Sequence, residues 1–82
     1  MSWSGHELTL VTASGCHFCE RALEVLDGLG IVAREIAVDS SAAAALADRG
    51  IPLAFLPVLT DGSRVIAYGR FSERRLRREL DL

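Results

Sequence analysis

Residues 8–30 read LTLVTASGCHFCERALEVLDGLG, and the spacing of the apolar residues changes once within this stretch. Before Gly15, apolar and β-branched residues run together over 8–12, which predicts a strand buried on both faces. After Gly15, apolar residues recur at helical spacing until two glycines, at 28 and 30, end the pattern. The stretch therefore predicts a strand that leads directly into a helix.

The next run, residues 31–38, has the length and the β-branched content of a second strand. A strand, a helix and a strand in succession form a βαβ unit, in which the strands are parallel and the crossover is right-handed. An alanine-rich helix is predicted over 42–49, with its N-cap among Asp39, Ser40 and Ser41 and with a glycine after its last residue.

The last third of the chain predicts a hairpin and a final helix. Two strand-length apolar runs, Val58–Thr60 and Val65–Tyr68, flank an Asp-Gly pair at 61–62, which is a strong hairpin signal. An apolar connection over 51–56 precedes the hairpin. Ser72 is the candidate N-cap of a helix that extends to about residue 80.

The predicted order is βαβαββα, an α/β architecture with a mixed four-stranded sheet flanked by three helices on both faces. We expect the parallel pair to lie centrally and the hairpin to lie at one edge. The chain has 82 residues, which fits a single domain over 1–82.

Composition excludes several classes of function. The net charge is −2, whereas nucleic-acid binding requires a strongly basic face. No apolar run approaches the roughly 20 residues of a membrane span. Residues 1–7 lack the basic and apolar regions of a secretory signal, so a cytoplasmic location is expected.

Cys16 and Cys19 are the only cysteines, and the ring they would close is too small to stabilise a fold. At the start of a helix, unpaired N–H groups and the helix dipole stabilise a thiolate. The pKa of Cys16 should therefore fall from about 8.5 into the range of roughly 3.5–7.5, which makes it a nucleophile. Cys19, one turn on and more buried, would resolve the mixed disulfide. His17 would stabilise the ionised Cys16, and Gly15 would let a substrate chain approach.

A zinc site is the main alternative for a Cys-x-x-Cys pair, since zinc takes four ligands. The other candidate ligands are His6, His17 and carboxylates. His17 lies inside the turn between the cysteines, and an extended strand would hold His6 roughly 15 Å away. A strand before the pair and a helix after it favour redox chemistry. No bound metal is expected.

Pro57 directly precedes an apolar strand-length run. It is either a residue at the start of a strand or a cis-proline that faces the cysteines. About 5–6% of X–Pro bonds are cis in folded proteins, so the base rate favours the first interpretation.

Four segments together resemble the glutaredoxin branch of the thioredoxin superfamily, over about residues 7–80. They are Leu10-Val11-Thr12 followed by Cys16-His17-Phe18-Cys19, then Leu56-Pro57, Asp61-Gly62 and Gly69-Arg70-Phe71-Ser72-Glu73. The resemblance implies a thioredoxin fold and a thiol-disulfide oxidoreductase in which Cys16 attacks and Cys19 resolves. It also implies a cis peptide before Pro57 and a Leu56 backbone that pairs with a substrate's backbone or with glutathione.

The implied partners are a disulfide-containing protein or glutathione, and a reductase. Glutathione would be a co-substrate, no cofactor would be bound, and a monomer is expected. The chain departs from the glutathione-using pattern at Ala13, where a lysine is usual, and at Arg70, where a second glycine is usual. Arg70 would hold a glutathione carboxylate bidentately, and Ser72 would assist from the helix start. Phe18 is expected to be exposed beside the cysteines.

Two other functions remain open. A dimer could hold an iron–sulfur cluster through Cys16 of each subunit and two external thiols, or the fold could serve as a non-catalytic thiol-sensing scaffold. The last helix is rich in arginine, and the pairs Glu73–Arg77 and Arg75–Glu79 predict a solvated face. The alternative for this helix is a docking site for an acidic partner.

Overall fold

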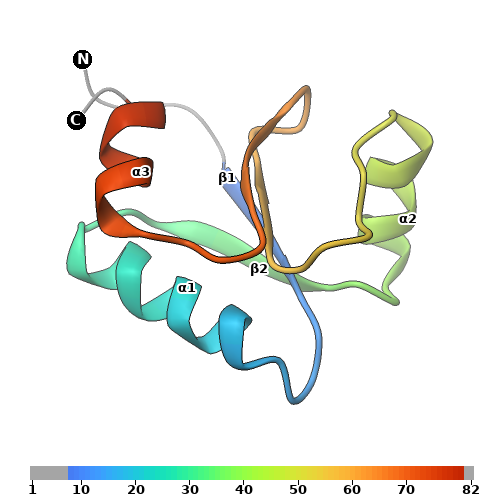
Figure 1. Ribbon diagram of the computed structural model, residues 1–82. Coiled ribbons are helices and arrows are strands. Elements are labelled where there is room, and N and C mark those ends of the chain that lie inside the picture. The colour runs from blue at the N-terminus through green and yellow to red at the C-terminus, as the bar shows by residue number, and fades with distance from the viewer. Residues whose placement is uncertain (1–7, 81–82) are drawn as a thin grey trace.

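The computed structural model describes residues 8–80, and the predicted order βαβαββα is confirmed (Figure 1). His6, considered above as a zinc ligand, lies outside the described residues. Within the described part, no helix has both the length and the apolar content needed to cross a membrane. The elements are β1 (Leu8–Thr12), α1 (His17–Gly28), β2 (Ala33–Ala37), α2 (Ser41–Asp48), β3 (Val58–Thr60), β4 (Val65–Tyr68) and α3 (Glu73–Glu79).

The strand order in the sheet is β2-β1-β3-β4. β1 is parallel to β2 and antiparallel to β3, and β3 is antiparallel to β4. The hairpin does lie at one edge, but the expectation of a central parallel pair is wrong, because β2 forms the opposite edge. The reason is visible in β2, where Arg34 and Glu35 are both exposed, whereas every residue of β3 is buried. Charged side chains on both faces are tolerated on an edge strand, whereas a central strand that is covered on both faces carries apolar ones.

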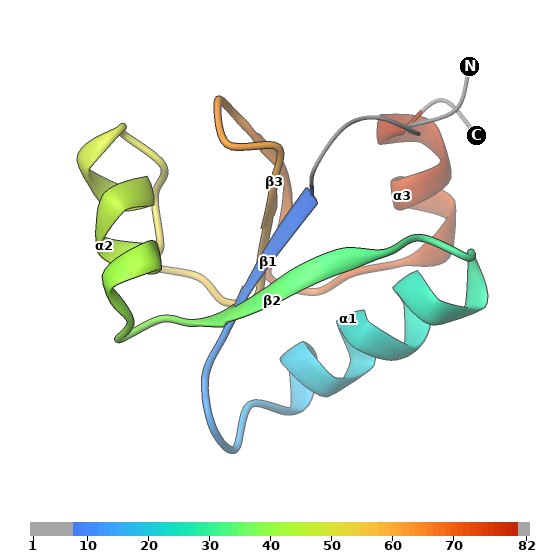
Figure 2. The same ribbon diagram turned by 180° about the vertical axis from the view of Figure 1, so that it is seen from behind.

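Helices cover both faces of the sheet, with α1 and α3 on one side and α2 on the other (Figures 1 and 2). Leu10 of β1 packs with the first pair of helices, while its neighbour Val11 packs with α2. The prediction that the first strand is buried on both faces is therefore confirmed. On the first face the core comprises Leu8, Leu10, Ala22, Leu26, Leu59, Ile66, Ala67, Phe71, Leu76 and Leu80. On the second it comprises Val11, Ile36, Ala43, Leu46, Ile51 and Val58.

The helix ends explain the observed boundaries. Ser40, one of the three predicted candidates, is the N-cap of α2 and accepts a hydrogen bond from the Ala43 N–H at 3.2 Å. At the end of α1, Gly30 has φ +71° and the Ile31 N–H donates to the Leu26 carbonyl at 2.9 Å. Because the Ile31 N–H is bonded to the end of α1, it is not available to a neighbouring strand. β2 therefore begins at Ala33 and not at the predicted residue 31.

The hairpin turn is held by one carboxylate. Oδ1 of Asp61 accepts hydrogen bonds from the Ser63 N–H and hydroxyl, both at 2.9 Å, and from the Arg64 N–H at 3.0 Å. Partial burial acts to raise the pKa of Asp61, but these hydrogen bonds and the Arg64 charge outweigh it, so the pKa lies below its usual 3.8. Gly62 occupies the turn with φ +96°. The predicted Asp-Gly hairpin is confirmed.

Candidate active site

The register of the sheet brings three segments, distant in sequence, to one end of the molecule. Val11, near the end of β1, pairs with Val58 at the start of β3, and Val58 pairs with Tyr68 at the end of β4. The loop that carries Cys16, the residue before β3 and the residues after β4 must therefore emerge together. Figures 1 and 2 show the first turn of α1 at this same end.

Cys16 and Cys19 are joined by a disulfide across the first turn of α1, with Cα atoms 5.2 Å apart. Cys16 is the N-cap of this helix, with an extended backbone conformation of φ −91° and ψ 108°. Its Sγ accepts a hydrogen bond from the Cys19 N–H at 3.1 Å, and its carbonyl accepts one from the Glu20 N–H at 3.2 Å. The predicted position of Cys16 at the N-terminus of a helix is confirmed.

The two sulfur atoms lie in different environments. The Cys19 side chain is buried, with 3% of its surface exposed, whereas Cys16 is only half-buried. The prediction that Cys19 is the more buried residue is confirmed. A substrate in solvent can therefore approach the Cys16 side of the pair, while Cys19 is shielded from it.

The residues around the pair leave its outer side open. Gly15 has φ +72°, a conformation that favours glycine, and a Cβ atom built on it would meet no atom within 4 Å. Phe18 is 53% exposed, which confirms the expectation for that ring. His17 is exposed, and its imidazole ring forms no hydrogen bond with any residue in 8–80. Its influence on Cys16 stays a prediction.

The peptide bond between Leu56 and Pro57 is cis, as the resemblance implies. The Pro57 carbonyl accepts a hydrogen bond from the Gly69 N–H at 2.8 Å, which ties the segment after β4 to this proline. The Leu56 backbone forms no hydrogen bond with the described backbone. Its N–H and carbonyl are therefore available to a strand-like ligand.

Arg70 and Ser72 follow this tie in sequence. Arg70 is exposed and forms no ion pair with the described residues. Ser72 is the N-cap of α3, as predicted, and its hydroxyl oxygen accepts a hydrogen bond from the Arg75 N–H at 3.1 Å. Capping uses one of the two lone pairs of that oxygen, so the second lone pair and the hydroxyl hydrogen remain for a ligand.

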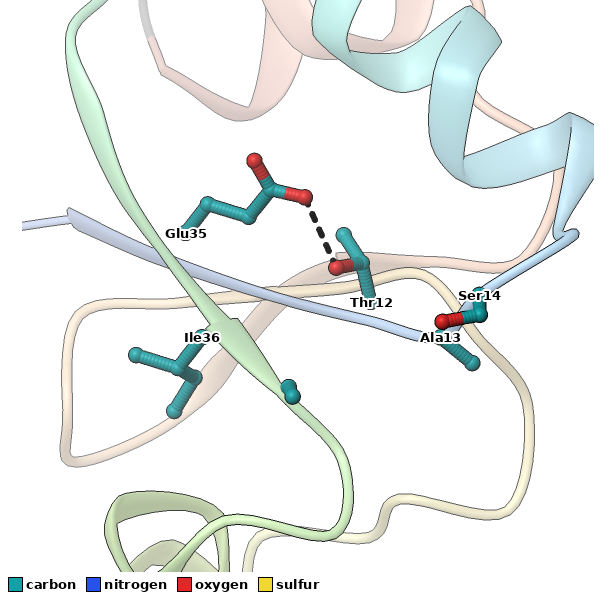
Figure 3. A pocket seen from close by; sticks show the side chains of 6 residues that line it. Thr12, Ala13, Ser14, Glu35 and Ile36 are labelled. Carbon is teal, nitrogen blue, oxygen red and sulfur yellow. Dashed lines mark hydrogen bonds between the residues drawn. The ribbon is translucent and has the colours of Figure 1, made fainter.

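A shallow hollow lies beside the cysteine loop, at the carboxyl ends of β1 and β2. Within it the buried Thr12 hydroxyl donates to Oε2 of Glu35 at 2.9 Å (Figure 3). The sequence did not indicate this pair, because the two residues are brought together only by the register of two strands. The hollow is lined by Thr12, Ala13, Ser14, Glu35, Ile36 and Ala37.

A second contact missed from the sequence lies beside Pro57. The rings of Phe55 and Tyr68 have centroids 6.3 Å apart, and the Arg75 guanidinium carbon lies 6.0 Å from the Tyr68 centroid. The predicted Glu73–Arg77 pair is confirmed at 3.2 Å. The predicted Arg75–Glu79 pair does not form, since Arg75 turns toward the tyrosine ring instead.

The described residues contain no cluster of three or more histidine, cysteine, aspartate or glutamate side chains that could hold a metal ion. His6, one of the zinc ligands considered from the sequence, lies outside them. His17 and the two cysteines thus do not form a three-ligand set in this structure.

A family model described as glutaredoxin matches residues 8–65, from the first residue of β1 to the first residue of β4. The matched stretch includes both cysteines and Leu56-Pro57. A search of curated proteins found no match.

Proposed function

Because the chain belongs to the glutaredoxin family, we propose that its Cys16–Cys19 dithiol reduces disulfides in proteins or mixed disulfides of glutathione. Thiol-disulfide exchange in general follows from the family and the close cysteine pair. The observation that carries the proposal is the disulfide across the first turn of α1, with its accessible sulfur on the N-cap residue.

The first step is attack on the target disulfide. The Cys16 thiolate forms a bond to one sulfur of that disulfide, and the other sulfur leaves as a thiolate. The N–H groups at the start of α1 favour the thiolate form of Cys16, so we expect its pKa to lie below that of an ordinary thiol. The Cys19 N–H already donates to this sulfur in the oxidised protein.

The second step releases the remaining substrate sulfur. The Cys19 thiolate attacks Sγ of Cys16, which expels the second substrate thiolate and forms the Cys16–Cys19 disulfide. Two electrons have then passed from the cysteine pair to the substrate. Two molecules of reduced glutathione, or a reductase, would supply two electrons to restore the dithiol.

The surrounding residues would position the substrate. The Leu56 N–H and carbonyl would pair with its backbone beside Pro57, while Gly15 leaves space and Phe18 offers an exposed apolar face. Arg70 would hold a carboxylate, aided by the Ser72 hydroxyl. His17 would stabilise the Cys16 thiolate through its charge or a hydrogen bond formed in the reduced state.

A reducing compartment suits this cycle, because the pair must be returned to the dithiol state after each turnover. We therefore place the protein in the cytoplasm, acting as a monomer on disulfide-containing proteins or glutathione, without a bound cofactor.

The test is turnover of a mixed disulfide between glutathione and a small thiol. One reaction contains glutathione with its reductase and the other contains thioredoxin reductase, with Cys16→Ser as the inactive control. Turnover in either reaction supports the proposal and identifies the electron donor. Full activity in the Cys16→Ser variant contradicts it.

The same preparation separates the two other functions. Visible absorption in anaerobically purified protein would indicate an iron–sulfur cluster, whereas a colourless protein with no turnover in either reaction would indicate a sensing scaffold. Neither has a structural observation in its favour.

A further inference from the structure

Three side chains form a continuous exposed surface beside the cis-proline segment. Phe55 is 68% exposed and Tyr68 is 51% exposed, although both are large apolar rings. They contact each other, and Arg75 covers part of the tyrosine ring. Exposed apolar side chains that cluster in this way mark an interaction site more often than singly scattered ones do. We call Phe55, Tyr68 and Arg75 the docking surface.

The docking surface is fixed to the redox site by the backbone. Phe55 directly precedes Leu56-Pro57, and Tyr68 pairs with Val58, the residue that follows Pro57. The residue after Tyr68 is tied to Pro57 by the hydrogen bond between the Gly69 N–H and the proline carbonyl. A chain that lies along Leu56 toward Cys16 therefore passes beside the docking surface.

The segment that carries Arg75 is positively charged. Residues 69–80 contain five arginines and two glutamates, so this segment has a net charge of +3. The rest of the chain has a net charge of −5, which gives −2 for the whole chain. Glu73 forms an ion pair with Arg77. No ion-pair partner within 8–80 is present for the other four arginines of this segment, Arg70, Arg74, Arg75 and Arg78. Unpaired guanidinium groups with free N–H donors favour a partner that carries carboxylates.

We propose that the docking surface binds an acidic, extended segment of a protein beside the disulfide that Cys16 attacks. This inference rests on the proposed function and names its substrate class. An apolar residue of the segment packs on the Phe55 and Tyr68 rings, and its carboxylates face Arg75 and the other unpaired arginines. The cation–π contact with Tyr68 favours this position of the Arg75 guanidinium and leaves its N–H groups free to donate.

The charge pattern selects this occupant over a second copy of the chain. A copy would bring a like-charged arginine segment against this one unless it docked through a different face, and like charges in contact oppose association.

The experiment uses three synthetic peptides with the same internal disulfide and one leucine. They differ in the residues that flank the disulfide. These are aspartate and glutamate in the first peptide, serine and glycine in the second, and lysine in the third. The full chain, reduced beforehand, is mixed with each peptide, and single-turnover rate constants are measured so that no external donor is needed. Binding of matched peptides with serine in place of cysteine is measured by fluorescence anisotropy on the oxidised protein.

The variants are Arg75→Ala, Arg75→Lys and Tyr68→Ser, with Arg34→Ala as the matched control. Arg34 is an exposed arginine on β2, at the opposite edge of the sheet, so its loss changes the net charge equally. Far-ultraviolet circular dichroism checks that each variant folds.

We expect the acidic peptide to react and bind about tenfold better than the lysine peptide at low salt, with a smaller ratio at high salt. Arg75→Ala should lower this ratio about threefold, Arg75→Lys should retain part of it, and Arg34→Ala should leave it unchanged. Tyr68→Ser should also lower it, because the guanidinium loses its aromatic support.

Equal binding of the three serine peptides would overturn the docking surface, as would equal effects of Arg75→Ala and Arg34→Ala. A dimer in sedimentation that Phe55→Ala dissociates would also overturn it, since a second copy would then be the occupant. If the acidic serine peptide binds selectively but no disulfide is reduced, the proposed function fails and the docking surface stands. If all three disulfides are reduced equally and none of the serine peptides binds selectively, the oxidoreductase stands alone.

Discussion

The Cys19 backbone N–H donates a hydrogen bond to Sγ of Cys16 at 3.1 Å, so the more accessible sulfur of the pair also caps the helix that carries the other. The same N–H would stabilise negative charge on Cys16 after reduction. Capping and thiolate stabilisation thus depend on one interaction.

The capping role predicts a difference between two inactive variants. Cys16→Ser retains an oxygen that accepts the Cys19 N–H, since serine is a favoured N-cap residue, whereas Cys16→Ala leaves that donor without a partner. We expect Cys16→Ala to be less stable than Cys16→Ser by about 1 kcal/mol in urea unfolding under reducing conditions. Equal stabilities would show that the cap contributes nothing.

The difference in burial predicts distinct roles for the two sulfurs. Cys19→Ser should form mixed disulfides with the substrate through Cys16 that persist, because no second thiol is present to release them. Cys16→Ser should form none, since Cys19 is buried. Mass spectrometry of both variants after incubation with glutathione disulfide measures this directly, and equal labelling of the two would contradict it.

The position of Cys16 at the helix start predicts an acidic thiol. In reduced Cys19→Ser, where Cys16 is the only thiol, we expect thiolate absorbance at 240 nm to rise at a pH below the about 8.5 of an ordinary cysteine. Reduced Cys16→Ser is the control, because its remaining thiol is buried within the first turn. A midpoint at or above the ordinary value would remove the basis for nucleophilic attack.

Two glycines, one before α1 and one in its last turn, should respond in opposite directions to alanine. Gly15→Ala places a Cβ at φ +72° and should destabilise the protein by about 1 kcal/mol, although no atom obstructs the new methyl group. Gly28 is helical and equally unobstructed, so Gly28→Ala should stabilise it by about 0.5–1 kcal/mol. Thermal unfolding of both variants provides the comparison, and a shift of the same sign in both would contradict the backbone argument.

Asp61 predicts a pH dependence of stability. Its pKa is lowered in the folded state, so its contribution is complete above the unfolded value of 3.8 and is lost as the pH falls through the folded value. At neutral pH, Asp61→Asn should cost about 1 kcal/mol, because an amide oxygen accepts the three hydrogen bonds less strongly than a carboxylate. Urea unfolding should show this difference shrinking as the pH falls below 3.8 and through the lower pKa of the folded state. A constant difference across that range would exclude the carboxylate as its cause.

The order of the helices and strands was predictable from the sequence, because the caps and turns that delimit them are formed by neighbouring residues. Ser40 and Ser72 cap helices through bonds to residues three positions on, and Asp61 closes its own turn. From the sequence, β2 was expected in the centre of the sheet, whereas it lies at an edge. Strand order depends on which strand pairs with the second side of β1, and that strand, β3, is distant in sequence. Arg75 was assigned to Glu79 on its own helix, whereas its observed contact is on β4.

The amino-acid sequence alone determined the redox pair and its place at the N-terminus of a helix. The change from strand spacing to helical spacing at Gly15 depends only on neighbouring residues. Only the tertiary structure decided which residues surround that pair. Pairing of Val11 with Val58 and of Val58 with Tyr68 brings Pro57 and the arginine-rich segment to the cysteine end of the sheet. Such contacts depend on strand register, and register follows from how two buried faces pack, which no single segment encodes.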